Sequence, residues 1–214
     1  MMTHPRREFL STVSSCLLLA SPLVSQSISS TLGKRYAMLM DVEKCFGCMA
    51  CVVACAAENN VPLGVFRTWI EYLEKPDGTR VFIPKQCNHC EDPPCVTPCP
   101  TKATYVTPDG LVLVNDELCI GCGACIMACP YGARYRNPIK GVADKCTFCD
   151  HRLAEGLLPA CVEACPTGAR IFGPLTEENE LSNTVEGRPT QVLKPFTGAK
   201  PMIFYLGLPD EVNR

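Results

Sequence analysis

Cysteines are the residues of this chain whose number and spacing most clearly predict chemistry. The 214-residue sequence contains 17 cysteines, and all but Cys16 fall into four sets of four. We number the sets in chain order: set one is Cys45, Cys48, Cys51 and Cys55; set two is Cys87, Cys90, Cys95 and Cys99; set three is Cys119, Cys122, Cys125 and Cys129; set four is Cys146, Cys149, Cys161 and Cys165. A chain of this length can bury an apolar core without disulfide bonds, so the large number of thiols needs a chemical explanation.

Set three reproduces the spacing by which bacterial ferredoxins bind [4Fe-4S] clusters. Its cysteines and Pro130 follow the pattern Cys-x2-Cys-x2-Cys-x3-Cys-Pro. Two intervening residues let a loop present thiolates to separate irons, and Gly121 and Gly123 permit the turns that this requires. In such a run the fourth cysteine, here Cys129, binds the second cluster of a two-cluster module. The proline after it ends the short helix that carries it.

Disulfide and zinc sites compete with the iron–sulfur interpretation. An even number of cysteines in an exported protein is compatible with disulfides, although a disulfide framework rarely repeats one spacing four times. Zinc ribbons use separated Cys-x2-Cys pairs and do not require a final x3-Cys-Pro. A colourless, iron-free protein that stays folded would favour either alternative. The sequence contains no Cys-x-x-Cys-His, so covalently attached c-type haem is not indicated.

A repeated motif around the cysteines predicts the elements that position them. Cys99 and Cys165 are each followed by Pro-Thr-x-Ala, and Cys129 is followed by Pro-Tyr-Gly-Ala. Between sets two and three, Asp109-Gly110 predicts a turn and residues 111–114 predict a strand. We therefore expect an α+β fold in which short helices and β-hairpins surround the clusters. Such units have little apolar core, so we expect folding to be coupled to metal binding.

The first thirty residues predict an export signal. Arg6-Arg7 is followed by Phe9 and Leu10, then by an apolar stretch from Leu17 to Val24 and a serine-rich segment. This pattern predicts that residues 1–30 are a twin-arginine signal peptide, in which Cys16 is a passive residue. We therefore expect a protein that is exported already folded to the periplasm or the outer face of the cytoplasmic membrane. The alternative is an ordinary basic N-terminus on a cytoplasmic protein.

Composition and motifs exclude several classes of function. The net charge is −2 and the pI about 5.9, which does not favour a nucleic-acid partner. No apolar run reaches the roughly 18 residues that suggest a transmembrane helix, so no direct membrane span is expected. Only three histidines are present and no GxGxxG or phosphate loop occurs, so we expect a non-catalytic electron carrier. A stand-alone redox enzyme would need an open coordination site or another cofactor.

The four sets, in this order, resemble those of the four-cluster ferredoxin-type iron–sulfur (beta) subunits of molybdopterin oxidoreductases. The beta subunits of polysulfide reductase and tetrathionate reductase are the most similar, and the resemblance extends from about Lys34 to the C-terminus. The stretches that carry it are Arg35-Tyr36-Ala37-Met38, Cys87 to Cys95 (Cys-Asn-His-Cys-Glu-Asp-Pro-Pro-Cys), Asp144 to Cys149, His151-Arg152-Leu153, Leu157 to Glu163 and Phe204 to Leu208.

The resemblance implies four [4Fe-4S] clusters whose ligands cross between the sets. We call the four implied groups site I (Cys45, Cys48, Cys51, Cys165), site II (Cys55, Cys146, Cys149, Cys161), site III (Cys87, Cys90, Cys95, Cys129) and site IV (Cys99, Cys119, Cys122, Cys125). Some relatives replace the residue at the position of Cys95 and carry a three-iron cluster, whereas the cysteine here implies four irons. One departure is Ala56 after Cys55, where a proline is expected; it weakens helix termination but removes no ligand.

The resemblance also implies two ferredoxin-like modules, one inserted into the other. Residues 34–77 and 140–175 form the outer two-cluster module, and residues 78–139 form the inserted one. Residues 176–214 are expected to be a C-terminal extension that docks a partner. Within it, the polar segment Glu177 to Arg188 is expected to be exposed. The apolar pattern Pro201 to Leu206 predicts a strand that either completes the fold or docks on the catalytic subunit.

The implied function is electron transfer within a respiratory complex. The chain would relay electrons between a quinone-reactive membrane subunit and a molybdopterin catalytic subunit in anaerobic respiration, as in reductases of polysulfide, tetrathionate or thiosulfate. Complexes of the nitrite, dimethyl sulfoxide or arsenate reductase type are alternatives, as is a stand-alone ferredoxin-like protein.

Several residues beside the ligands are candidates for tuning the cluster potentials. They are Lys44, Lys145, His89 and His151. The competing interpretation is that they are solvated or bind carboxylates of a partner. The single tryptophan, Trp69, follows a loop that begins at Pro62, and we expect it to pack in the core.

Overall fold

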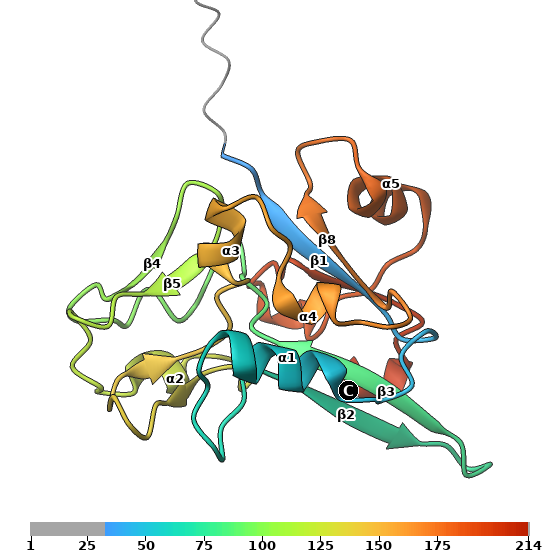
Figure 1. Ribbon diagram of the computed structural model, residues 1–214, viewed down its shortest axis with the longest axis horizontal. Helices are drawn as coiled ribbons and strands as arrows, with labels where there is room; N and C mark the ends of the chain where they lie inside the picture. Colours follow the sequence, from blue (N-terminus) through green and yellow to red (C-terminus); the bar gives the residue numbers. More distant parts are fainter. Residues whose placement is uncertain (1–32, 214) are drawn as a thin grey trace, which may run out of the picture. The chain divides into compact units, whose positions relative to one another are not determined.

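Antiparallel strand pairs separate the cysteine sets in the computed structural model, which describes residues 33–213 (Figure 1). Strand β1 (Tyr36–Asp41) precedes set one and pairs with β8 (Arg170–Pro174), which follows set four. The other pairs are hairpins between successive sets: β2 (Thr68–Glu74) with β3 (Arg80–Gln86), β4 (Thr104–Val106) with β5 (Val112–Val114), and β6 (Tyr135–Arg136) with β7 (Ala143–Asp144). Each cysteine set therefore lies between two strand pairs.

Short helices carry or directly follow the cysteines of three sets. These helices are α1 (Ala50–Glu58), α2 (Ala124–Met127), α3 (Asp150–Ala154) and α4 (Ala160–Glu163). Helix α1 is the longest of the four and continues past Cys55, because Ala56 can extend a helix where the other sets have proline. The mixture of short helices and strands confirms the predicted α+β class.

The C-terminal extension completes the main sheet. It contains α5 (Glu180–Gly187), η1 (Pro195–Thr197), β9 (Ile203–Leu206) and η2 (Asp210–Asn213). Strand β9 pairs in parallel with β1, giving a sheet of order β8-β1-β9. Ile203 and Tyr205 are buried in it, so the predicted apolar strand completes the fold. Docking by other parts of the extension stays a prediction.

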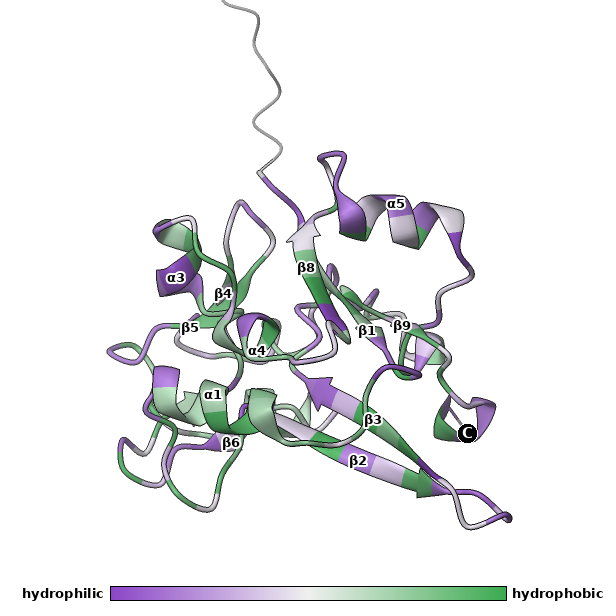
Figure 2. Ribbon diagram, turned by 45° about the vertical axis from the view of Figure 1, so that its right-hand side comes forward, coloured by the Kyte–Doolittle hydropathy of each residue, from purple (hydrophilic) through white to green (hydrophobic). Residues whose placement is uncertain are grey.

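The segment from Glu177 to Arg188 is mostly exposed, as expected, but it forms helix α5 and one side of it is buried. Asn179 caps the helix: its side chain accepts hydrogen bonds from the backbone N–H groups of Leu181 and Ser182, and Ser182 Oγ accepts one from the Asn179 N–H. The helix is hydrophilic over much of its surface (Figure 2). However, the side chain of Leu181 in this helix is fully buried in the cluster that contains Ala37 and Leu39 of β1. A single apolar stripe was enough to anchor a mostly polar segment.

The two faces of β1 belong to two different apolar clusters. Met38 and Met40 pack on one face into the core that contains Cys51, Cys146 and Cys161. Ala37 and Leu39 pack on the other face, with Leu181 of α5. Because side chains alternate along a strand, β1 joins the cysteine-rich core to the C-terminal extension.

Trp69 lies in β2 and is half-buried against the core, which agrees with the packing role expected for it. Its indole Nε1–H donates to Glu71 Oε1 at 2.9 Å. Among residues 33–213, no helix combines the length and the apolar character needed to cross a membrane.

Candidate iron–sulfur cluster sites

In each cysteine set, the residue directly before the second cysteine has a left-handed backbone conformation. That position holds Gly47 in set one (φ 77°) and Gly121 in set three (φ 66°). In sets two and four it holds His89 (φ 42°) and Phe148 (φ 57°). Left-handed backbone is uncommon for residues other than glycine, so its presence in all four sets indicates a shared loop geometry.

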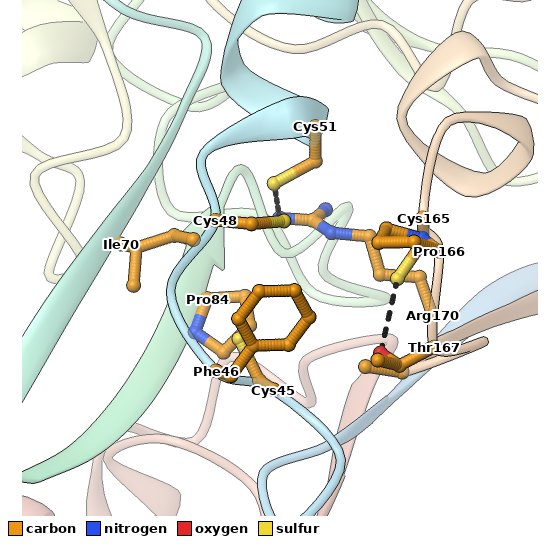
Figure 3. A pocket seen from close by; sticks show the side chains of 11 residues that line it. Cys45, Phe46, Cys48, Cys51, Ile70, Pro84, Cys165, Pro166, Thr167 and Arg170 are labelled. Atoms are coloured by element: carbon orange, nitrogen blue, oxygen red, sulfur yellow. Dashed lines mark hydrogen bonds between the residues drawn. The ribbon is translucent and has the colours of Figure 1, made fainter.

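Site I is a cavity lined by three cysteines of set one and one of set four (Figure 3). Its thiols are those of Cys45, Cys48, Cys51 and Cys165. The first three come from the loop before α1 and from the first turn of that helix, and the fourth comes from the turn between α4 and β8. The rest of the wall is mostly apolar, and Arg170 is its one charged residue.

Two further cavities bring together cysteines from different sets in the same way. The cavity of site II is lined by Cys55, Cys146, Cys149 and Cys161. The cavity of site III is lined by Cys87, Cys90, Cys95 and Cys129. Each combines three cysteines of one set with the last cysteine of another. The cysteines therefore meet in groups that follow the fold and not their order in the chain.

The cysteines of site IV are less enclosed. Cys122 is exposed, and Cys99 and Cys119 are half-buried. Cys119 and Cys125 pack in one apolar cluster, which also contains Cys95 of site III. Backbone N–H groups hold two of the sulfurs: Thr104 donates to Cys99 Sγ at 3.5 Å, and Ala143 donates to Cys119 Sγ at 3.4 Å.

The thiols of sites I, II and III line cavities and are not gathered around a single metal-ion position. All sixteen cysteines that the structure describes carry free thiols. Within residues 33–213, no group of three His, Cys, Asp or Glu side chains is gathered tightly enough to hold a single metal ion. A four-iron cube binds each of its thiolates at a different iron, so four thiols around a cavity suit it.

Burial strongly opposes ionisation of the enclosed thiols. Burial, together with the nearby Cys161 and Cys149, raises the pKa of Cys55 to about 12. Burial and the neighbouring cysteines of site III likewise raise the pKa of Cys90 to about 12. Since thiolates are the ligands of iron, cluster binding must release these protons and compensate the buried charge.

Cys99 and Cys165, which are each followed by Pro-Thr, have lowered pKa values in contrast to the enclosed thiols. Burial raises the pKa of Cys99, but hydrogen bonds from Thr104 and Thr101 outweigh it and lower the pKa on balance. In the same way, Thr167 outweighs burial at Cys165 and lowers its pKa; the hydroxyl of Thr167 lies 3.8 Å from Cys165 Sγ. These groups stabilise the thiolate form.

The four residues predicted as tuning candidates divide into two buried and two surface residues. The Lys44 side chain is half-exposed, and its Nζ lies 3.5 Å from Asp41 Oδ2. His151 is half-exposed, and its Nε2 lies 2.8 Å from Glu58 Oε1. A tuning role for either stays a prediction.

His89 and Lys145 are fully buried and link set two to set four. His89 Nδ1 accepts a hydrogen bond from the Val112 N–H, and Nε2 lies 3.1 Å from the carbonyl oxygen of Cys146. Lys145 Nζ donates to that same oxygen at 2.7 Å and also to the Val112 carbonyl. The His89 ring stacks on Phe148 with centroids 3.8 Å apart. Burial, reinforced by Lys145, holds the pKa of His89 well below its usual range.

Sequence reasoning missed three polar residues that lie against the cysteines. Arg170 Nη2 donates to Cys51 Sγ at 3.4 Å. Asn59 Nδ2 lies 3.7 Å from Cys55 Sγ and 3.6 Å from Cys149 Sγ, both of site II. Arg134 lines the cavity of site III. A signal was present for the arginines, because sets three and four both read Cys-Pro-x-Gly-Ala-Arg.

The residues around the cavities suit an anionic iron–sulfur group. Several buried polar atoms have no hydrogen-bond partner among residues 33–213: Arg134 Nε and Nη2, Asn88 Oδ1 and Nδ2, and the hydroxyl of Thr147. Buried polar groups are normally hydrogen-bonded, so unpaired polar atoms beside the cysteines indicate that these cavities suit a group that can bond to them. Four thiols per cavity together with unpaired N–H donors match the donor set that [4Fe-4S] clusters use. These features define a ferredoxin-type iron–sulfur protein.

Comparison with known proteins agrees with this class. Two models of the 4Fe-4S dicluster domain match, over residues 44–103 and 79–175. The B subunit of the tetrathionate reductase of Archaeoglobus fulgidus is 56% identical over 176 residues, which cover 82% of this chain and 84% of that protein. The B component of the polysulfide reductase of Wolinella succinogenes is 46% identical over 180 residues, covering 81% and 94%.

A third relative is the thiosulfate reductase electron transfer subunit of Salmonella typhi, 46% identical over 160 residues that cover 72% of this chain and 83% of that one. The protein belongs to the family of 4Fe-4S dicluster iron–sulfur subunits found in tetrathionate and polysulfide reductases. The names of these relatives confirm the prediction of an electron-transfer subunit of a reductase.

Proposed function

We propose that this chain holds four [4Fe-4S] clusters, one in each of sites I to IV. The observation that carries the proposal is the mixing of sets in sites I, II and III, where three cysteines of one set share a cavity with the last cysteine of another. This is the crossed arrangement of two-cluster ferredoxins. When bound, each cluster supplies one-electron redox chemistry at the cavity that the thiols define.

The neighbours of the cysteines support a linear order of the sites. Cys51 of site I, Cys161 and Cys146 of site II, and Cys87 of site III belong to one core cluster. Besides burial, the nearby Cys51 raises the pKa of Cys161, and the nearby Cys87 raises that of Cys146, which supports a position of site II between sites I and III. Cys95 of site III and Cys125 of site IV belong to another. The order I–II–III–IV differs from the order of the sets in the chain. The core thus fixes the separations between successive sites and excludes water from the middle of the path.

Exposure supports the assignment of sites I and IV as the two ends. Cys48 of site I and Cys122 of site IV are the exposed thiols, whereas all four cysteines of site II are buried. An electron carrier must approach its partners at its ends and insulate its middle. The exposure pattern fits that requirement.

The pairing of sites supports two modules, one inserted in the other. Sites I and II use sets one and four, and β1 and β8 pair outside them. Sites III and IV use sets two and three, which the β4–β5 hairpin joins. Residues 34–77 and 140–175 would then form the outer module and residues 78–139 the inserted one.

The names of the relatives support a place in a respiratory reductase. We infer that the chain relays electrons between a quinone-reactive membrane subunit and a molybdopterin catalytic subunit that reduces polysulfide, tetrathionate or thiosulfate. The relatives are named as parts of reductases of these three compounds. The C-terminal extension is proposed to contribute to docking.

Crossed ligation is testable with pairs of cysteine variants. Cys51 and Cys55 lie one helical turn apart in α1, yet the proposal assigns them to sites I and II. In anaerobically purified full-length protein, C55S and C161S should remove the same midpoint potential from a redox titration, and C51S a different one. C16S should leave all four potentials in place. Wild-type protein with far fewer than about sixteen irons would contradict four clusters. Loss of one common potential in C51S and C55S would contradict the crossed arrangement.

The expectation of export by the twin-arginine pathway rests on residues outside those that the structure describes. We propose that the folded chain is carried to the periplasmic side. Replacing both Arg6 and Arg7 by lysine should leave iron-loaded protein in the cytoplasm, as cell fractionation with iron analysis would reveal. Undiminished periplasmic protein in that variant would contradict the proposal.

A further inference from the structure

Arg134 and Arg170 occupy equivalent positions in the two proposed modules. Each is the fifth residue after the last cysteine of its set, in the repeat Cys-Pro-x-Gly-Ala-Arg. Arg134 is 5% exposed and Arg170 is 3% exposed. Arginine is almost never buried this fully unless it is paired, so both guanidinium groups require a partner for their charge.

Arg170 lies between site I and site II. Its Nη2 donates to Cys51 Sγ of site I and, at 3.0 Å, to Thr68 Oγ1, as Figure 3 shows for the cysteine. Its Nη1 donates at 2.8 Å to Gln86 Oε1, and Gln86 lines the cavity of site II. Burial lowers the pKa of Arg170, but Cys161 of site II and Cys51 of site I raise it above its usual value. The guanidinium therefore interacts with a ligand of each site.

Arg134 has the corresponding place between site III and site IV. It lines the cavity of site III. Burial lowers its pKa, and Cys95 and Cys87 of site III with Cys125 of site IV raise it on balance. Its Nη1 donates to Thr104 Oγ1 at 3.2 Å, and the Thr104 N–H donates to Cys99 Sγ of site IV at 3.5 Å. Nε and Nη2 have no hydrogen-bond partner among residues 33–213.

The two arginines share one hydrogen-bonding scheme. Arg170 bonds to Thr68, the first residue of the strand that follows set one. Arg134 bonds to Thr104, the first residue of the strand that follows set two. In each module an arginine after one set thus holds a threonine after the other set. A scheme repeated at two distant places indicates a common role.

That role follows from the charge of the sites. Four thiolates around an iron–sulfur cube leave net negative charge, and one-electron reduction adds to it without adding a counter-ion. A permanent cation nearby stabilises the reduced form more than the oxidised form, because the attraction grows with the added charge. A buried guanidinium acts more strongly than an exposed one, since water screens it less.

We propose that Arg170 raises the reduction potentials of sites I and II together, and that Arg134 raises those of sites III and IV together. The inference rests on the proposed function, since it requires that the sites hold clusters. Each arginine compensates two neighbouring anionic sites at once, so a module can accept electrons at both sites with less mutual repulsion.

The test uses iron-loaded full-length protein with R134Q, R170Q and the double variant. Each midpoint potential is measured by redox titration with electron paramagnetic resonance. R170Q should lower two of the four potentials, R134Q should lower the other two, and the double variant should lower all four. We expect at least a tenfold change in each affected reduction equilibrium, about 59 mV for one electron. This pattern needs no prior assignment of signals to sites.

K44Q is the matched control, because Lys44 is adjacent to Cys45 but half-exposed. It removes a charge beside site I without removing a buried one, and should shift the potentials less than R170Q. If a glutamine variant retains too little iron to titrate, R134K and R170K replace it. Lysine keeps the positive charge but lacks the planar set of N–H donors with which arginine bonds to several groups at once. We therefore expect smaller shifts in the same pairs of midpoint potentials.

Two results would overturn the inference. One is that the two arginine variants lower the same potentials; the other is that neither exceeds the shift of K44Q. Both require an iron-replete protein with four measurable potentials. A wild-type protein that lacks about sixteen irons would instead contradict the proposed function, so the two failures are distinguishable.

Discussion

At the residue scale, the loops of the cysteine sets depend on where a side chain is tolerated. Gly121 and Gly123 flank Cys122, and both have left-handed backbone. A Cβ on Gly123 would have open space, and set one carries Met49 at the equivalent position with φ 62°. A Cβ on Gly121 would lie 2.3 Å from the carbonyl oxygen of Gly141. The two glycines therefore have different reasons for being there.

We predict that G121A impairs site IV much more than G123A. Left-handed backbone costs a residue with a side chain roughly 1–2 kcal/mol at either position. Only G121A also forces Gly141 away, and the carbonyl of Gly141 accepts a hydrogen bond from Arg136 Nε at 3.1 Å. Iron content and the rate of iron loss on warming would measure the difference. Equal losses in the two variants would contradict the steric explanation.

Residue types and spacings predicted the ligands but not the groups around them. The four sets could be predicted because their spacing is local, whereas the crossed grouping of their cysteines was implied by the family resemblance. The partners of Arg170 were not, since Thr68 and Gln86 are 102 and 84 residues away in the chain. Lys145 and His89 lie beside cysteines in the sequence, but their distant partners could not be predicted: Lys145 bonds to the carbonyl of Val112, 33 residues away, and His89 lies against that of Cys146, 57 residues away.

At the element scale, local pairings were predictable and distant ones were not. The Asp109-Gly110 turn is followed by β5, as predicted, and Gly110 has φ 78°. The pairing of β1 with β8 joins the two ends of the cysteine-rich region and leaves no local pattern. The exposure of most of α5 was predictable from its polar composition, whereas the burial of Leu181 was not, because it depends on a sheet formed by distant strands.

The placement of β9 in the main sheet predicts a structural role for Ile203. I203A should lower the free energy of unfolding by about 2–5 kcal/mol, because it leaves a cavity beside β1. I139A is the matched control: Ile139 is 81% exposed, and its loss should change stability by less than about 0.5 kcal/mol. Anaerobic urea denaturation would measure both. A negligible effect of I203A would mean that β9 is not part of the stable core.

At the scale of the whole molecule, exposed apolar side chains lie beside both ends of the proposed path. Phe46, in the wall of site I, is 57% exposed, and Ile120, between two cysteines of site IV, is 66% exposed. Leu63 is 99% exposed but lies beside Cys55 of the buried site II. Apolar groups at a surface next to exposed thiols favour contact with a partner at each end.

Two partners at two ends predict separable losses of assembly. F46D should release one of the two proposed partner subunits, and I120D the other, because an aspartate in an apolar contact weakens it by at least about 2 kcal/mol, roughly 30-fold. L63D should release neither. Co-purification from solubilised membranes would show which subunits remain with each iron-loaded variant. If F46D and I120D released the same subunit, both partners could not lie at opposite ends, and the linear path from site I to site IV would have to be abandoned.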